Sequence, residues 1–179
     1  TLATGNSPGN DMRFYIERVE SSRNFANKIW KASRFIFMNL ENFGDKEISK
    51  ERAMNSLELS DKWIISKANK VAADVTENID KFELGLAAEK IYDFAWSEFC
   101  DWYIEMVKPR LYGEDDEAKN AALYTLTYVL EKILKLLHPF MPFITEEIYS
   151  YLGKEEKIIV AQWPHYDENE NFEKEEQQM

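Results

Sequence analysis

The sequence is poor in the residues that break regular structure or cross-link a chain. Only six Gly and five Pro occur in 179 residues, so we expect long regular elements with few tight turns. The single cysteine, Cys100, excludes an internal disulfide and a cysteine metal cluster, which favours a cytoplasmic setting. No apolar run reaches the roughly 18 residues of a membrane-spanning helix, so we predict no membrane partner.

Residues typical of catalytic or nucleotide-binding sites are also scarce. The segment GNSPG at residues 5–9 lacks the lysine and the strand-to-helix context of a phosphate-binding loop. His138 stands alone at a predicted helix end, where it is expected to be a C-terminal cap or a partly buried core group, and His165 stands alone in the tail. Cys100 is interpreted as a core residue. The sequence therefore predicts no catalytic residue and no metal site.

Charge is distributed unevenly along the chain. A net charge of −11 argues against a nucleic-acid partner if it is spread evenly. The first 34 residues, however, contain six basic and three acidic residues, so their net charge is +3 and that of the other 145 is −14. A basic segment on an acidic body can hold a polyanion on one face while the remaining surface repels it.

Apolar residues recur at three- and four-residue steps, which predicts amphipathic helices. We expect long helices from residue 12 or 17 to 40, from 58 to 79, from 83 to 107 and from 116 to 137, and a short fifth from 142 to 152. Ser60 or Asp61 is the expected N-terminal cap of the second helix, and Pro109 and Pro139 are expected to end the third and fourth. The pattern predicts an all-α antiparallel bundle.

Three parts of the chain are expected from its composition. Residues 1–11 are rich in Gly, Asn, Ser and Pro and are predicted to be a linker, and the start of the sequence suggests the interior of a longer chain. Residues 12–153 form the predicted helical domain. Residues 154–179 hold the strand-like run IIVAQWP, followed by an acidic tail that we expect to be disordered.

Two further sets of side chains on these helices receive a structural interpretation. Glu98, Asp101 and Glu105 share one helix face, and without a neighbouring His they favour a solvated or salt-bridged face over a catalytic or metal site. Tryptophans in the apolar phase of their helices are predicted to be core residues: Trp30, Trp63, Trp96 and Trp102. Trp163 is expected to anchor the tail.

The first helix presents a polar, basic face opposite its apolar stripe. Residues spaced four, four and three apart form one ridge on this face: Arg23, Asn27, Lys31 and Arg34. Lys28 and Phe35 lie beside the ridge. Arg and Lys suit phosphate, Asn can contact a base edge, and an exposed Phe can stack on an unpaired base. A basic face paired with acidic neighbours explains the same pattern, so the residues alone leave both interpretations open.

Five segments, in this order, resemble the C-terminal part of the valyl-tRNA synthetases, which are class I enzymes: GNDMRF (9–14), RNFANKIWKASRF (23–35), DWYIEMVKPRL (101–111), LLHPFMPFITEEIY (136–149) and AQWP (161–164). The resemblance extends over roughly residues 1–166. It implies that residues 1–14 leave the catalytic core and that the rest is the helical anticodon-binding domain. HPFMPFITEEIY is shared with leucyl, isoleucyl and methionyl relatives.

The resemblance also implies partners and residue roles. Lys28, Arg34 and Phe35 match positions that contact bases and phosphates of the anticodon loop, with Phe35 as the stacking ring, whereas Lys31 stands where relatives often have Asn. The implied partners are a valine-specific tRNA and two other domains of the same enzyme, the catalytic core and the editing domain. The HIGH and KMSKS motifs do not occur in this sequence. The resemblance therefore implies no cofactor for this chain and ATP with magnesium for the full-length ligase.

Two other functions remain as alternatives. One is the anticodon-binding domain of an isoleucyl- or leucyl-tRNA synthetase, which would use the same bundle for different anticodon bases. The other is a helical scaffold that binds proteins and not RNA, in which acidic neighbours neutralise the basic ridge.

Overall fold

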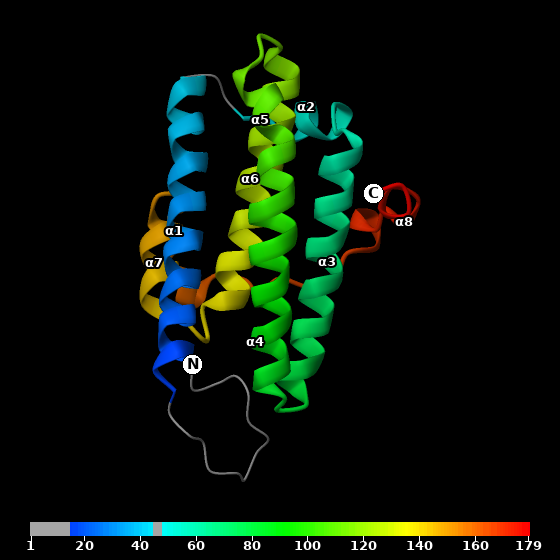
Figure 1. Cartoon of the computed structure of the whole chain (residues 1–179). Coiled ribbons are helices and arrows are strands. Elements are labelled where there is room, and N and C mark those ends of the chain that lie inside the picture. The colour runs from blue at the N-terminus through cyan, green and yellow to red at the C-terminus, as the bar shows by residue number, and fades with distance from the viewer. Residues whose placement is uncertain (1–14, 45–47) are drawn as a thin grey trace.

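The computed structural model describes residues 15–44 and 48–179, and these form an all-α bundle without a strand (Figure 1). Its long helices are α1 (Ile16–Phe43), α3 (Leu59–Asp80) and α6 (Asp116–Leu137). The fourth rod is a continuous column of α4 (Leu84–Asp93), the π-helix η1 (Phe94–Tyr103) and α5 (Ile104–Tyr112). The predicted fold class is confirmed, and the described helices include none that is long and apolar enough to cross a membrane.

Shorter elements complete the bundle. The sequence did not predict α2 (Lys50–Asn55), which packs on α6, whereas α7 (Pro142–Ser150) matches the predicted fifth helix and packs on α1 and α6. Single 3₁₀ turns at Ile158–Val160 and Glu168–Glu170 precede the four-residue α8 (Glu173–Glu176). The predicted linker at residues 1–11 lies outside the described residues.

Two predicted helix ends were wrong. Pro109 does not end the third rod, because α5 continues to Tyr112. Proline removes one backbone donor, but Leu111 is buried and Arg110 is bound to Asp61 of α3, so tertiary contacts hold the last turn in place. The N-terminal cap of α3 is Glu58 and not Ser60 or Asp61. The Glu58 N–H donates to the Asp61 carboxylate at 2.9 Å.

The π-helix changes which residues of the third rod face the core. Two pairs of its buried residues lie five apart, Phe94 with Phe99 and Ala95 with Cys100, as the wider turn of a π-helix allows. Trp102 was expected in the core on the α-helical period, but its side chain is 61% exposed. That prediction was wrong because the wider turn moves position 102 out of the apolar phase.

A charged cluster lies inside the bundle and ties α3 to the third rod. Asp61 is fully buried and accepts hydrogen bonds from the Tyr103 hydroxyl at 2.6 Å and from both terminal nitrogens of Arg110 at 2.6 and 2.7 Å. Burial, together with the Asp61 charge, raises the pKa of Tyr103 well above its usual range. The two carboxylate oxygens are therefore fully used in fixing the rods relative to each other.

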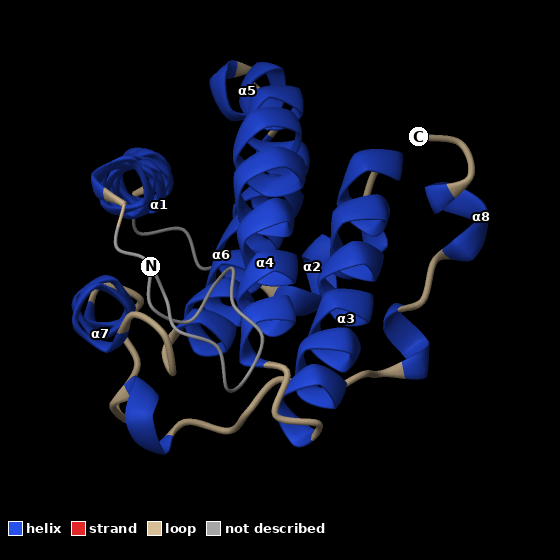
Figure 2. Cartoon of the chain, turned by 60° about the horizontal axis from the view of Figure 1, so that its bottom comes forward, coloured by secondary structure: helices blue, strands red, loops and turns tan. Residues whose placement is uncertain are grey.

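The C-terminal segment differs from both expectations. Ile158–Val160 is one 3₁₀ turn and not a strand, since only Ile158 of the three is buried and no strand occurs in residues 15–44 and 48–179 to pair with it. The tail, expected to be disordered, lies along the outer side of α3 (Figure 2). There Asn69 donates to the backbone oxygen of Asp167 and accepts from its N–H, and Phe172 packs against the core.

Candidate nucleic-acid interface

The outer face of α1 is open, because α1 packs on the bundle through the opposite face. Its inward residues Phe25, Ile29 and Ile36 are buried, and they meet η1, α6 and α7. Figures 1 and 2 place α1 at the edge of the bundle, next to α7 and apart from α3. Residues a half-turn away from the buried stripe consequently point to solvent.

The ridge predicted from the sequence lies on this open face. Arg23, Asn27, Lys31 and Arg34 are all exposed. Within residues 15–44 and 48–179, none of these four side chains forms a hydrogen bond, ion pair or ring contact. Among the residues that the structure describes, no acidic side chain therefore pairs with the three cations of the ridge.

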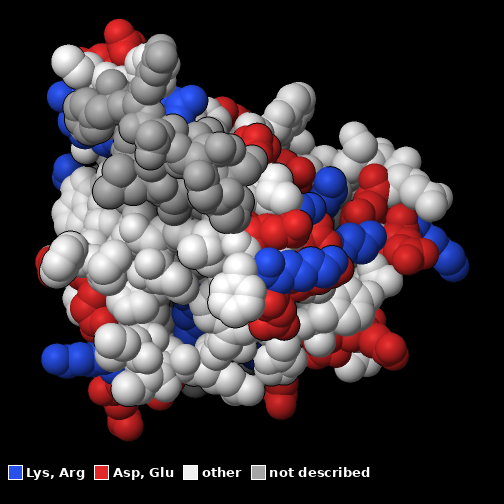
Figure 3. Space-filling model, turned by 90° about the horizontal axis from the view of Figure 1, so that it is seen from below, with Lys and Arg blue, Asp and Glu red and all other residues white. Residues whose placement is uncertain are grey.

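Most other surface cations of the bundle are paired. Seen from the end at which α1 begins, blue basic and red acidic side chains interleave over the visible surface (Figure 3). Lys90 with Asp74 at 2.6 Å and Lys70 with Glu176 at 2.8 Å are examples. Against this mixed background, three unpaired cations on one helix face are a distinct electrostatic feature.

Lys28 lies on the flank of the ridge and is engaged within the protein. Its ammonium is 2.5 Å from the Asp101 carboxylate and 3.7 Å from the centre of the Trp96 ring. The side chain of Asp101 is about half exposed, at 52%, and exposed ion pairs contribute little net stability. A phosphate can therefore compete with Asp101 for Lys28, but Lys28 is not the free cation that the sequence suggested.

Phe35 is less available than a stacking platform requires. The ring is half-buried and packs against the core of the bundle. On its open side the Lys108 ammonium of α5 lies 5.8 Å from the ring centre. The structure thus brings Phe35 to the edge of the ridge but leaves only part of its surface for a base.

The three acids of the third rod are salt-bridged, as the sequence favoured, but Glu98 faces α3 whereas Asp101 faces α1. Asp101 binds Lys28, Glu98 lies 3.4 Å from Lys67, and Glu105 lies 2.5 Å from Lys108. Among the described residues, no group of three or more His, Cys, Asp or Glu side chains is arranged to hold a metal ion.

The remaining sequence candidates occupy structural positions. Cys100 is buried, and burial raises the pKa of its thiol to about 12, which confirms its interpretation as a core residue. His138 is the C-terminal cap residue of α6, and its Nδ1 lies 2.8 Å from the Thr145 hydroxyl. Trp163 anchors the tail as expected, since its Nε1 donates to the Thr76 hydroxyl at 2.9 Å.

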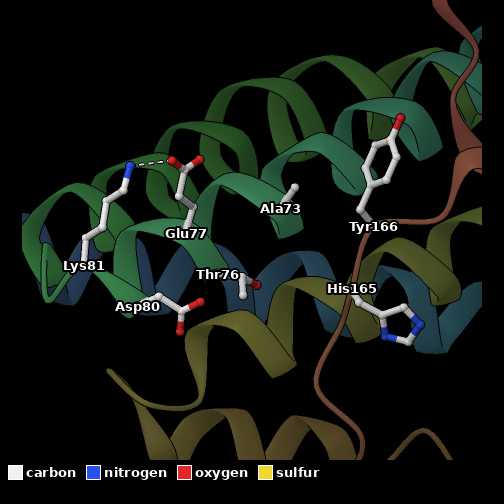
Figure 4. Close-up of a pocket in the computed structure, with 7 residues that line it drawn as sticks. All are labelled: Ala73, Thr76, Glu77, Asp80, Lys81, His165 and Tyr166. Carbon is white, nitrogen blue, oxygen red and sulfur yellow. Dashed lines mark hydrogen bonds and ion pairs between the residues drawn. The ribbon is translucent and has the colours of Figure 1, made fainter.

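A hollow between α3 and the tail offers no comparable site. It is lined by Thr76, Glu77, Asp80, Lys81 and His165, with Ala73 and Tyr166 (Figure 4). Glu77 and Lys81 form an ion pair with each other, and the Thr76 hydroxyl already accepts from Trp163. The polar groups are therefore spread along an open surface and do not converge on one position.

Comparison with known proteins defines the class of this domain. A family model described as the anticodon-binding domain of tRNA ligase matches residues 61–179. The chain therefore belongs to the family of anticodon-binding domains of tRNA ligases. The match begins in α3, so the ridge on α1 lies outside it.

More specific similarity covers α1 as well. The chain is 57% identical over 169 residues to the valine–tRNA ligase of Clostridium acetobutylicum, covering 93% of this chain and 19% of that protein. It is 55% identical over 180 residues to the valine–tRNA ligase of Clostridium perfringens, covering 99% and 20%. For that of Clostridium tetani the identity is 56% over 178 residues, covering 97% and 20%. The chain spans about a fifth of the length of these relatives.

The sequence missed one exposed aromatic residue beside the interface. Trp102 follows Asp101, the partner of Lys28, but the α-helical period of the sequence predicts a core position for it. No spacing in the sequence indicates the π-helix, because Ala95, Phe99 and Tyr103 also fit the four-residue steps of an α-helix.

Proposed function

We propose that this chain recognises the anticodon loop of a tRNA through the outer face of α1, as part of a valine–tRNA ligase. The observation that supports this most directly is the ridge of Arg23, Asn27, Lys31 and Arg34, exposed and without side-chain partners among the described residues. It lies on a chain whose net charge is −11 and whose family is that of anticodon-binding domains.

The ridge has the chemistry that a single-stranded RNA loop requires. Arg23, Lys31 and Arg34 supply charge for phosphates, which positions the strand without reading its sequence. Asn27, between two of these cations, has both a donor and an acceptor for a base edge. Lys28 and the open part of Phe35 extend the contact toward the third rod. The acidic remainder of the surface repels the backbone and so favours one orientation.

The chemistry of the whole ligase is a wider proposal that rests on the relatives. Valine would be joined to its tRNA at the expense of ATP, with magnesium, by a catalytic core that carries the HIGH and KMSKS motifs, in the cytoplasm. An editing domain and that core would be partners of this bundle within one enzyme. On this proposal the present chain contributes recognition and no catalytic residue.

The test is the binding of labelled tRNA transcripts by fluorescence anisotropy between about 50 and 200 mM salt, a range over which phosphate contacts weaken steeply. We expect tighter binding of valine tRNA than of isoleucine or leucine tRNA. Combining Lys31→Ala with Arg34→Ala should weaken binding and reduce the slope of log K against log salt by about 0.7 per lost contact to a single strand. Lys174→Ala, an exposed lysine on α8 beyond α3, is the matched control and should change neither.

Two outcomes would reject the proposal in favour of an alternative. Equal or tighter binding of isoleucine or leucine tRNA would assign the chain to one of those ligases. The absence of salt-sensitive RNA binding, with the double variant indistinguishable from Lys174→Ala, would leave a protein-binding scaffold.

A further inference from the structure

Trp102 differs from the other tryptophans in its environment. Its side chain is 61% exposed, whereas Trp63 is buried at 9% and Trp30, Trp96 and Trp163 pack against the core. A large aromatic ring exposed to water lacks the favourable free energy that burial of its apolar surface provides. Such a ring gains that burial only when a ligand covers it.

An uncommon backbone conformation, a π-helix, turns this ring toward solvent. A π-helix of ten residues, Phe94–Tyr103, interrupts the third rod, and the N–H of Ile104 still bonds to the carbonyl of Phe99, five residues earlier. π-helical turns are rare and occur frequently at functional sites. Here the wider turns keep Phe99 and Tyr103 in the core while they move Trp102 to the surface.

Trp102 lies in the rod beside α1 and directly follows the residue that contacts the flank of α1. Asp101, its neighbour in the chain, lies 2.5 Å from Lys28 on the flank of α1. About two turns further along, the Lys108 ammonium of α5 lies 5.8 Å from the centre of the Phe35 ring of α1. α1 and the column of α4, η1 and α5 lie side by side (Figure 1), and these two contacts join the flank of α1 to that column.

We propose that Trp102 is a stacking platform for an unpaired base of the RNA whose phosphates lie on the α1 ridge. This inference rests on the proposed function and adds a second, base-contacting side to the same interface. Every base has a face that an indole ring can cover, so stacking requires no particular sequence. It also supplies the platform that Phe35, half-buried, offers only in part.

The carboxylates near Trp102 in the third rod favour a base over a phosphate at this position. Asp101 is paired with Lys28 of α1 and Glu105 with Lys108 of α5, whereas Glu98 is paired with Lys67 of α3. Carboxylates disfavour a phosphate beside the ring, yet they accept hydrogen bonds from the amino groups of bases. The strand is therefore best accommodated with its backbone on the cations of α1 and a base turned toward η1.

The experiment compares Trp102→Ala and Trp102→Phe with the parent chain in the anisotropy assay, with valine tRNA as the probe. Stacking predicts that Trp102→Ala raises Kd at least about fivefold, and that Trp102→Phe retains most of the affinity. The salt slope should stay at the parent value, because no cation is removed. Phe82→Ala, which truncates a ring that is 83% exposed in the turn after α3, is the matched control and should bind like the parent. Thermal melts monitor folding.

The outcomes distinguish this inference from the proposed function. If Trp102→Ala binds like the parent while the Lys31 and Arg34 variants weaken binding, the stacking role is rejected and the anticodon role stands. If Trp102→Ala and Trp102→Phe lower affinity equally, or if Phe82→Ala lowers it as much, the effect is not stacking and the inference is again rejected. If neither the ridge variants nor Trp102→Ala affects binding, both proposals fail.

Discussion

Removing the carboxylate of Asp61 should destabilise the bundle more than any change at a surface ion pair. Asp61 is fully buried and holds Tyr103 at 2.6 Å and Arg110 at 2.6 and 2.7 Å, while the Glu58 N–H donates to it at 2.9 Å. In Asp61→Ala, these donors lose their acceptor, and Arg110, whose side chain is only 10% exposed, remains as a buried, weakly compensated charge.

The magnitude follows from this geometry. Breaking a buried ion pair by removing one partner costs about 3–5 kcal/mol. Native domains are stable by about 5–15 kcal/mol, so the loss would be a large fraction of the total. For a domain of this size, each kcal/mol corresponds to about 2–4 °C, so Tm should fall by about 6–20 °C. Asp61→Asn preserves the shape but turns an amide donor toward Arg110, so we expect most of the same loss.

The assay is urea unfolding followed by circular dichroism, with thermal melts in parallel. The control is Asp74→Asn, which removes one partner of the exposed pair between Asp74 and Lys90 and should leave the midpoint close to that of the parent. Adding Arg110→Met to Asp61→Asn should recover part of the loss, because the unpaired buried charge is removed. A loss below about 1 kcal/mol in Asp61→Ala, or no recovery in the double variant, would refute the reasoning.

Three other predictions concern titration and accessibility. Burial, followed by the charges of Glu170 and Glu131, raises the pKa of Tyr124 from its usual 10.0 to about 12, so stability should be lost as pH rises above about 10. Urea midpoints should fall less steeply with pH in Tyr124→Phe, and an unchanged slope would contradict this. Burial raises the pKa of Cys100 to about 12, so iodoacetamide should label it slowly in the native chain and rapidly in denaturant; equal rates would contradict its burial. Burial raises the pKa of Glu176, but hydrogen bonds from Lys70 and Ser66 outweigh it and lower the pKa below its usual 4.5. The stability that ionised Glu176 contributes is therefore complete at neutral pH and is lost as pH falls through the lowered pKa. Hydrogen exchange in residues 167–176 should consequently accelerate in acid more than exchange in α6.

Helices with regular apolar periods were predictable from the sequence. Residues 116–137 were predicted as a helix and match α6 to the residue, because acidic residues begin it and Pro139 follows its end. The ridge on α1 was also predictable, since residues three and four apart share a face of any long helix. The spacing could not decide whether its cations were free, because their partners would come from helices distant in the chain.

The sequence by itself determined the all-α bundle, the basic segment on an acidic chain and the motifs of the family, since each depends on residues close together along the chain. Only the tertiary structure decided which groups pair across the bundle. Lys28 is bound to Asp101, Pro109 lies within a helix held in place by Arg110, and the tail packs on α3. It also decided that Trp102 faces solvent, because a π-helix replaces the α-helical period over which the sequence was interpreted. Helix type, like ion pairing, depends on contacts between distant segments, and local periodicity does not encode these contacts.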